Sequence, residues 1–140
     1  MNNKGLMVYK GVVHPELCDV MGHMTTRHYV TMFDDASYHF LYSLFGWSGE
    51  HAKTLNRGWA DVKHVIEYQD EVAAGELLEI QANLTKLGTK SITVTYTMLN
   101  IGKNKAQVAT LESTSVYFDT LNRKAVPLTS EMKIAAGPYI

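Results

Sequence analysis

The residues best suited to chemistry in this 140-residue chain lie between Asp19 and Phe45. Asp19 stands in a short loop that turns at Gly22 and carries His23, and a long helix is predicted to follow. The first turn of a helix has unpaired N–H groups and partial positive charge, which can stabilise a developing oxyanion. A carboxylate beside that turn can act as a nucleophile or as a general base. This stretch is therefore the candidate active site.

The helix is predicted from the spacing of its apolar residues. From Arg27 onward they recur at intervals of three and four, which predicts one helix of about five turns. The hydroxyl oxygen of Thr25 or Thr26 can cap its first turn. The apolar band is broad, so we expect the helix to be enclosed on most sides. Its members are Tyr29, Val30, Met32, Phe33, Ala36, Tyr38, Phe40, Leu41, Tyr42, Leu44 and Phe45.

The composition excludes several classes of function. Thirteen basic and 14 acidic residues leave a formal net charge of −1, without the basic face that nucleic acid binding needs. No apolar run reaches the roughly 20 residues that cross a bilayer, and the first ten residues lack the apolar core of a signal peptide. The single cysteine, Cys18, excludes an internal disulfide and fits a reducing compartment. We expect one cytoplasmic domain over residues 1–140, with neither nucleic acid nor membrane as a partner.

Strands are predicted on both sides of the helix. Residues 6–14 form a β-rich segment before it, and residues 59–68, 77–87, 91–101 and 105–119 show strand patterns after it. Turn signals between them predict short hairpins, so the last four strands should be antiparallel. Short helical turns are expected at residues 51–56 and after Thr129 or Ser130.

These elements predict how the chain is organised in space. The apolar face of one sheet must be covered, and the long helix is the only predicted element that can cover it. We therefore expect an α+β fold in which a curled antiparallel sheet of about five strands wraps around one long helix. Such a sheet leaves two exposed edges, and pairing of edges in a homodimer or a dimer of dimers would protect them.

The central stretch also carries a family motif. Its residues, at fixed spacing, are Asp19, Gly22, His23, Met24 and Tyr29, followed by the segment Phe33, Asp34, Asp35 and Ala36. This pattern resembles the N-terminal motif of hotdog-fold acyl-CoA thioesterases of the 4-hydroxybenzoyl-CoA thioesterase type, and the strand order is similar over essentially the whole chain. Thr25 and Thr26 stand where that family usually has two asparagines. The surrounding sequence is also similar to thioesterases of carnitine and betaine breakdown.

The resemblance implies hydrolysis of a small acyl-CoA thioester to a free acid and coenzyme A. The substrate contains the coenzyme A, so neither a separate cofactor nor a metal is expected. In this hypothesis Asp19 is the nucleophile or the general base, and the sequence leaves both routes open. The backbone N–H of Thr26 polarises the carbonyl group, and His23 orients the carboxylate or contacts the substrate. Asp35 is a second acid that would face the pocket at a dimer seam.

Further residues are predicted to bind the substrate. The aromatic side chains near the helix end either pack in the core or hold a flat ring or a quaternary ammonium group. Two lysines that flank a hairpin either are solvated or hold the phosphates of coenzyme A, as the resemblance implies. The predicted substrate-binding residues are Gly22, Met24, Thr25, Tyr29, Trp47, Trp59, Lys86 and Lys90.

Three other interpretations remain open at this stage. A hotdog dehydratase or hydratase would act on the same kind of thioester, but its characteristic histidine runs are not found. A non-catalytic hotdog module would bind an acyl or thioester ligand without turning it over. A metal site at Asp19, His23 and His28 has a spacing that suits no standard pattern.

Overall fold

The computed structural model describes residues 5–140. Residues 1–4, part of the start predicted to lack a signal peptide, lie outside the described residues. None of the described helices is both long and apolar enough to cross a bilayer. The elements follow in the order β1 (Leu6–Val12), η1 (Pro15–Leu17), α1 (Thr26–Phe45), α2 (Gly49–Leu55), β2 (Arg57–Tyr68), β3 (Leu77–Leu87), β4 (Ser91–Asn100), η2 (Ile101–Lys103), β5 (Ala106–Asp119), β6 (Lys124–Ala125), α3 (Ser130–Ala136) and η3 (Gly137–Tyr139).

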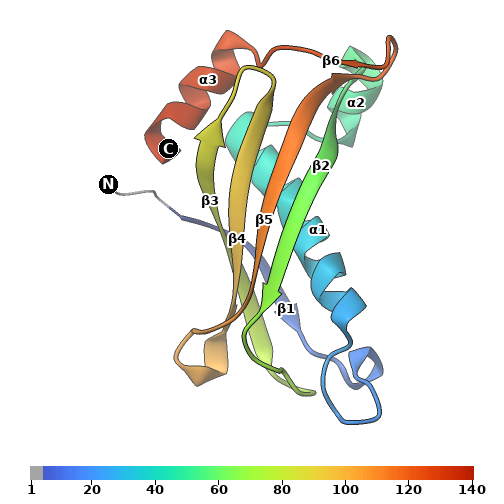
Figure 1. The fold of residues 1–140 in the computed structure, drawn as a ribbon, viewed down its shortest axis with the longest axis vertical. Coiled ribbons are helices and arrows are strands. Elements are labelled where there is room, and N and C mark those ends of the chain that lie inside the picture. The colour runs from blue at the N-terminus through green and yellow to red at the C-terminus, as the bar shows by residue number, and fades with distance from the viewer. Residues whose placement is uncertain (1–4) are drawn as a thin grey trace.

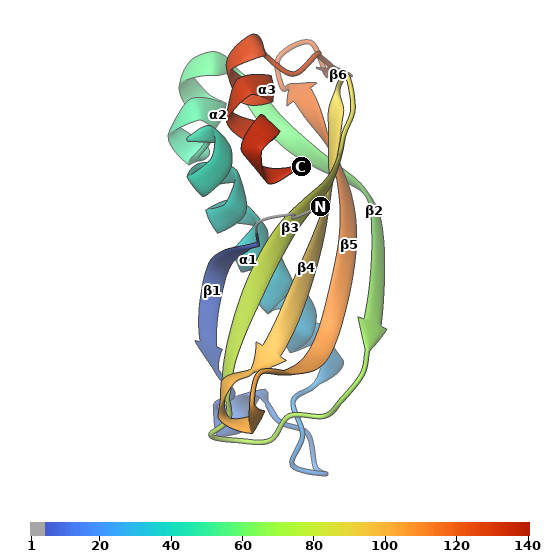
Figure 2. The same ribbon diagram turned by 90° about the vertical axis from the view of Figure 1, so that its left-hand side faces the viewer.

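One antiparallel sheet with the strand order β1-β3-β4-β5-β2 curls around α1, and β6 extends it beside β5 (Figures 1 and 2). This arrangement confirms the predicted hotdog fold. The core lies between α1 and the concave face of the sheet, where strand side chains alternate between buried and partly exposed. On α1 the fully buried residues include Phe33, Ala36 and Phe40. The short α3 packs against α1 and closes the end of the sheet where α1 finishes (Figure 2).

The position of β2 differs from the sequence prediction. A chain of hairpins would place β2 next to β3, but β2 pairs with β5 at one edge, and β3 pairs with β1 near the other. The segment 69–76 therefore crosses from one edge of the sheet to the other. It is longer than the two to five residues of an ordinary hairpin loop, which leaves room for the crossing. As a result, this segment lies at the same end of the sheet as the start of α1 (Figure 1), where the Met24 N–H donates to the carbonyl oxygen of Val72 (2.9 Å).

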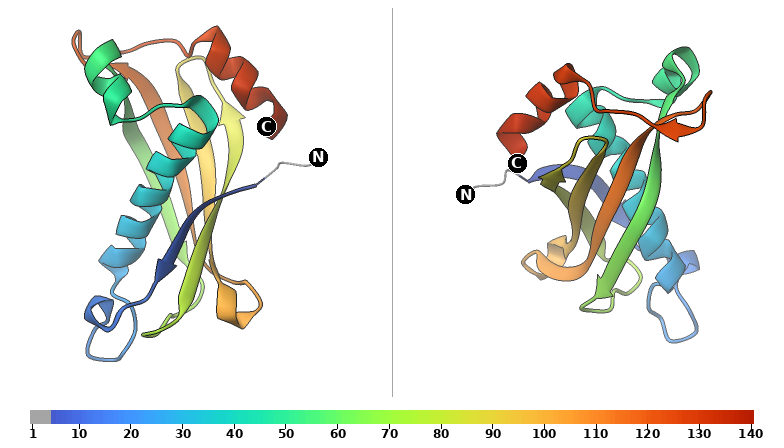
Figure 3. Two further views of the ribbon diagram at one scale, coloured as in Figure 1. Left: turned by 180° about the vertical axis from the view of Figure 1, so that it is seen from behind. Right: turned by 45° about the horizontal axis from the view of Figure 1, so that its top comes forward.

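The surroundings of α1 also differ from the prediction. The helix is not enclosed on most sides, because Val30, Tyr38 and Tyr42 are 39%, 58% and 63% exposed. One face of α1 covers the sheet, and no other element of the described chain lies over the opposite face (Figure 3). Thr25 occupies the N-cap position, but its side chain makes no capping hydrogen bond. The predicted cap of the terminal helix is confirmed, since the Thr129 hydroxyl accepts from the backbone N–H of Met132.

Candidate active site beside Asp19

Backbone hydrogen bonds close the loop that carries Asp19. The Asp19 N–H donates to the carbonyl oxygen of His23 (2.9 Å), and the Gly22 N–H donates to that of Asp19 (3.0 Å). Gly22 has φ +85°, a conformation that glycine adopts without steric cost. The Asp19 carboxylate accepts through Oδ1 from the N–H groups of Met21 (2.9 Å) and His23 (3.3 Å). One carboxylate oxygen is thus anchored, and Oδ2 accepts no hydrogen bond from residues 5–140.

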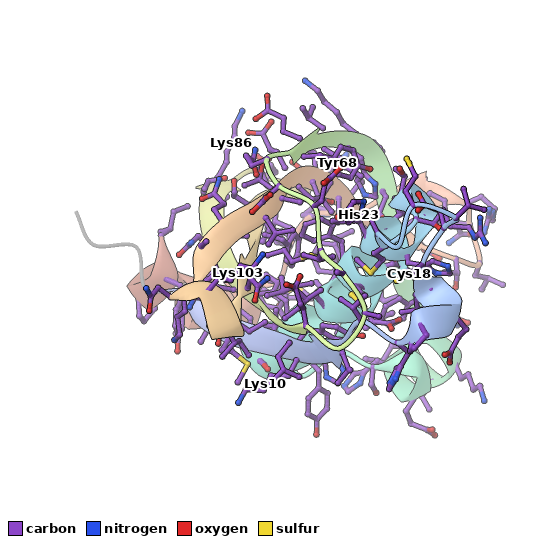
Figure 4. All side chains as sticks on the ribbon, turned by 90° about the horizontal axis from the view of Figure 1, so that it is seen from below. Lys10, Cys18, His23, Tyr68, Lys86 and Lys103 are labelled. Carbon is purple, nitrogen blue, oxygen red and sulfur yellow. The ribbon has the colours of Figure 1, made fainter. Side chains whose placement is uncertain are left out.

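A hollow of about 320 Å³ lies beside this loop. Three segments form it: the Asp19 loop, the first turns of α1, and the segment that follows β2. The hollow is within the size range of small-ligand sites. Its lining residues are Asp19, Met21, His23, Met24, Thr26, Tyr29, Tyr68, Gln69, Asp70 and Glu71. Two of these residues, His23 and Tyr68, are labelled in the view from below (Figure 4).

The N-terminal end of α1 lies at this hollow, which Thr26 lines. Thr25 is extended, with φ −66° and ψ 142°, and Thr26 is the first helical residue. The Thr26 N–H belongs to the first turn, which has no intrahelical acceptor, and it has no other hydrogen-bond partner in the described chain. Partial positive charge also gathers at this helix end. Asp19 and the first residue of α1 therefore line one cavity, and acyl transfer uses a carboxylate and an N–H donor in such an arrangement.

Tyr29 of α1 and the residues at and after the end of β2 give the hollow an aromatic and acidic lining. The rings of Tyr29 and Tyr68 meet edge to face with centroids 5.2 Å apart. Burial raises the pKa of the Tyr29 hydroxyl, a hydrogen bond with the backbone of Val72 lowers it, and the carboxylates of Asp70 and Glu71 raise it further. The sequence analysis missed these two acids. Asp70 and Glu71 lie directly after a predicted strand and before a turn, a position that could have marked them as candidates.

Other predicted residues lie away from this hollow. Trp47 and Trp59 lie at the C-terminal end of α1, and the helix of 20 residues separates them from Asp19 by about 30 Å. Lys86 and Lys90 are exposed around the β3–β4 hairpin, which lies at the same far end as α3 (Figure 1). The predicted site residues are therefore divided between two ends of the domain.

The remaining predicted residues lie closer to Asp19 without lining its hollow. Gly22 and Thr25 are in the loop and at the helix start, outside the lining. Asp35 is exposed on α1, and its charge acts on Tyr9 of β1, whose pKa is raised first by burial and then by this carboxylate. Asp35 therefore faces the β1 side of the helix rather than the carboxylate of Asp19.

A second hollow, of about 60 Å³, lies where α1 crosses β2. Two carboxylates line it, Asp34 from α1 and Asp61 from β2. The pKa of Asp34 is raised by burial and then by the negative charges of Asp61 and Asp35. Asp61 accepts from the hydroxyl of Ser115 (2.7 Å) and lies 3.6 Å from Nε2 of His64.

Aromatic side chains form the other walls of this second hollow. Tyr38, Trp47 and Trp59 all line it, and the rings of Tyr38 and Trp47 have centroids 6.1 Å apart. Trp59 stacks on Phe45 at 5.7 Å and contacts Tyr117 at 5.0 Å. Carboxylates beside aromatic faces are the groups that bind organic cations in proteins.

Comparisons with known proteins place this geometry in a family. The model of the thioesterase-like superfamily matches residues 13–135, and no curated protein matches the chain significantly. A Staphylococcus aureus protein determined in complex with CoA superposes with a TM-score of 0.87 at 17% identity, over 96% of this chain and 84% of that one. A gentisyl-coenzyme A thioesterase gives 0.78 at 19% identity, over 94% and 98%. A 1,4-dihydroxy-2-naphthoyl-CoA thioesterase from Synechocystis gives 0.79 at 16% identity, over 94% and 95%. At these identities the solved structures establish the fold.

Proposed function

The chain belongs to the thioesterase-like superfamily, and from that premise we propose that it hydrolyses an acyl-CoA thioester to a free acid and coenzyme A. One observation carries the proposal: Asp19 and Thr26, the first residue of α1, line the same hollow. The anchored Oδ1 fixes the carboxylate, while Oδ2 is free to react. Within the superfamily, we assign the chain to the 4-hydroxybenzoyl-CoA thioesterase type because of its motif.

Two routes are compatible with this geometry. In the first, Oδ2 of Asp19 attacks the acyl carbon, the C–S bond breaks to release the thiolate, and water then hydrolyses the mixed anhydride. In the second, the carboxylate takes a proton from a water molecule that attacks the same carbon. In both, negative charge develops on the carbonyl oxygen, and the Thr26 N–H stabilises it.

Thiol release from a panel of acyl-CoA substrates tests the proposal. Asp19→Asn keeps an oxygen for the loop N–H groups but removes the charge, so it should fold normally. We expect it to lose about 10²–10⁴ in rate, which is the usual contribution of acid–base catalysis, and Asp19→Ala should lose at least as much. Full thiol release by Asp19→Asn would contradict the proposal. Hydration of a double bond without thiol release would indicate a hydratase, and binding without turnover a non-catalytic module.

For the acyl group, we propose a chain that carries a quaternary ammonium, as in betainyl-CoA. The second hollow supports this proposal because it combines the rings of Tyr38, Trp47 and Trp59 with the carboxylates of Asp34 and Asp61. A cation over aromatic faces gains roughly 0.5–2 kcal/mol, and 1.4 kcal/mol corresponds to a factor of about ten. Betainyl-CoA should therefore be hydrolysed about tenfold more efficiently than its neutral isostere 3,3-dimethylbutanoyl-CoA. Equal kcat/KM values for the two would refute the proposed acyl group.

A homodimer would bring the two hollows together. The outer edge of β2 has no partner strand in the described chain, and Val62 and Val65 on this strand are exposed. Two copies paired antiparallel along β2 place the start of this strand beside its end in the partner. The Asp19 hollow of one protomer then adjoins the aromatic hollow of the other. We propose this dimer as the active unit, and light scattering of the protein in solution measures its mass.

The proposed dimer also bears on the hairpin lysines. Lys86 and Lys90 flank the β3–β4 hairpin, which lies at the same end of the sheet as α2 (Figure 1), so the pairing would carry them toward the partner's Asp19 end. Their role in holding the phosphates of coenzyme A stays a prediction.

A further inference from the structure

The segment that follows β2 is joined to the Asp19 loop at three points. The Met24 N–H donates to the carbonyl oxygen of Val72 (2.9 Å). His23 and Ala73 form an isolated antiparallel bridge. Finally, Nε2 of His23 lies 3.4 Å from Oε2 of Glu71. The main chain of this segment therefore supports the loop, and Glu71 alone reaches a loop side chain.

His23 connects this segment to the candidate catalytic carboxylate. Its backbone N–H donates to Oδ1 of Asp19 at 3.3 Å, and its carbonyl oxygen accepts from the Asp19 N–H at 2.9 Å. A shift of the His23 main chain therefore changes the direction of the Asp19 carboxylate. The position of the His23 ring depends in turn on the carboxylate of Glu71.

The orientation of the His23 ring is not explained by stability. Glu71 is 71% exposed and His23 36% exposed, and exposed ion pairs contribute little to folding. Nδ1 of His23 is buried and has no hydrogen-bond partner among the described residues. An unpaired buried acceptor costs more free energy than an exposed pair returns. The His23–Glu71 contact thus does not stabilise the fold, and it lies where a side chain of the segment after β2 meets the Asp19 loop.

We propose that Glu71 is a positioning residue for thioester hydrolysis, acting through His23 to hold the Asp19 carboxylate with Oδ2 toward the hollow. This role rests on the proposed function. In this role the Oε2 atom of Glu71, 3.4 Å from Nε2 of His23, is the partner that favours a proton on Nε2, one of the two ring nitrogens that can carry it. The adjacent Asp70 accepts from the backbone N–H of Glu71 (2.8 Å) and so fixes where the Glu71 side chain begins.

Variants of Glu71 with matched controls test this role. A small displacement of a catalytic group reduces turnover strongly, so Glu71→Ala should lower kcat about tenfold and leave KM unchanged. Glu71→Gln retains an acceptor oxygen at the same reach and should recover most of the activity. Glu71→Asp retains the charge, but its shorter side chain should not recover it. Glu16→Gln removes an exposed carboxylate near the same loop and should leave kcat at the wild-type value.

A double-variant cycle and a spectroscopic readout separate positioning from a general structural effect. In a His23→Gln background, Glu71→Ala should cause no further loss of kcat. The nitrogen NMR signals of His23 should show the Nε2–H tautomer in the wild type and lose that preference in Glu71→Ala. A wild-type kcat in Glu71→Ala would overturn the role of Glu71 and leave the proposed function intact. So would an equal loss of kcat when Glu71→Ala is made in the wild type and in His23→Gln. Absence of thiol release by the wild type would instead overturn the proposed function.

Discussion

Replacement of Thr26 by proline removes one backbone N–H from the hollow without interrupting α1. Thr26 is the first helical residue, where the fixed φ of proline fits and the missing N–H breaks no intrahelical bond. Thr25 already has φ −66° and ψ 142°, the extended conformation that a residue before proline favours. The Thr26 side chain is exposed and makes no hydrogen bond in the part of the chain that the structure describes.

The expected effect on catalysis is large and the effect on folding small. Loss of one oxyanion donor lowers kcat by about 10²–10³, or about 2.7–4 kcal/mol of transition-state stabilisation. Proline at a position that already has a compatible backbone changes the free energy of unfolding by about 0.4–1 kcal/mol, in favour of the folded state. The Thr26→Pro protein should therefore keep its helix and its Tm while losing nearly all turnover.

The assay compares kcat for thiol release in the wild type, Thr26→Pro and Thr26→Ala, with circular dichroism and thermal unfolding of each. Thr26→Ala removes the hydroxyl group and keeps the N–H, so its kcat should stay close to the wild-type value. If Thr26→Pro is folded and turns over as fast as Thr26→Ala, the helix end does not supply the oxyanion donor. Loss of kcat in both variants would assign the effect to the side chain instead.

Two further predictions concern stability. Phe33 is a fully buried residue of α1. Phe33→Ala should therefore lower the free energy of unfolding by about 3–5 kcal/mol in chemical denaturation. The pKa of Asp119 is lowered, first by a hydrogen bond from the backbone of Asn122 and also by the Asn122 side chain, the Leu121 N–H and Arg57. Its contribution to stability is therefore present above the unfolded-state pKa and disappears as pH falls through the folded-state pKa. Asp119→Asn should lower the urea midpoint of unfolding at pH 7. In acid, the midpoints of the variant and the wild type should become equal. A difference in midpoint that does not change with pH would show that Asp119 does not cause this pH dependence.

Local features of the sequence determined the helices, the strands and the site residues between Asp19 and Tyr29. The intervals of three and four along α1 and the alternation along β4 depend only on near neighbours in the chain, so they were visible without a structure. The same holds for the Asp19 loop, where Gly22 permits the turn and the helix start follows within a few residues. Asp19, His23, Met24, Thr26 and Tyr29 share a hollow because the chain keeps them close.

The tertiary structure alone decided which distant segments meet. Periodicity shows which face of an element is apolar but not which element covers it, so the exposure of Tyr38 and Tyr42 could not be foreseen. The order of strands depends on pairing between residues far apart in the chain. This pairing places β2 beside β5 at one edge of the sheet and not beside β3. That placement carries Asp70 and Glu71 to the start of α1 and makes them part of the lining of the hollow. The stacking of Trp59 of β2 on Phe45 likewise depends on tertiary packing, and it places Trp59 at the end of α1 that is far from Asp19.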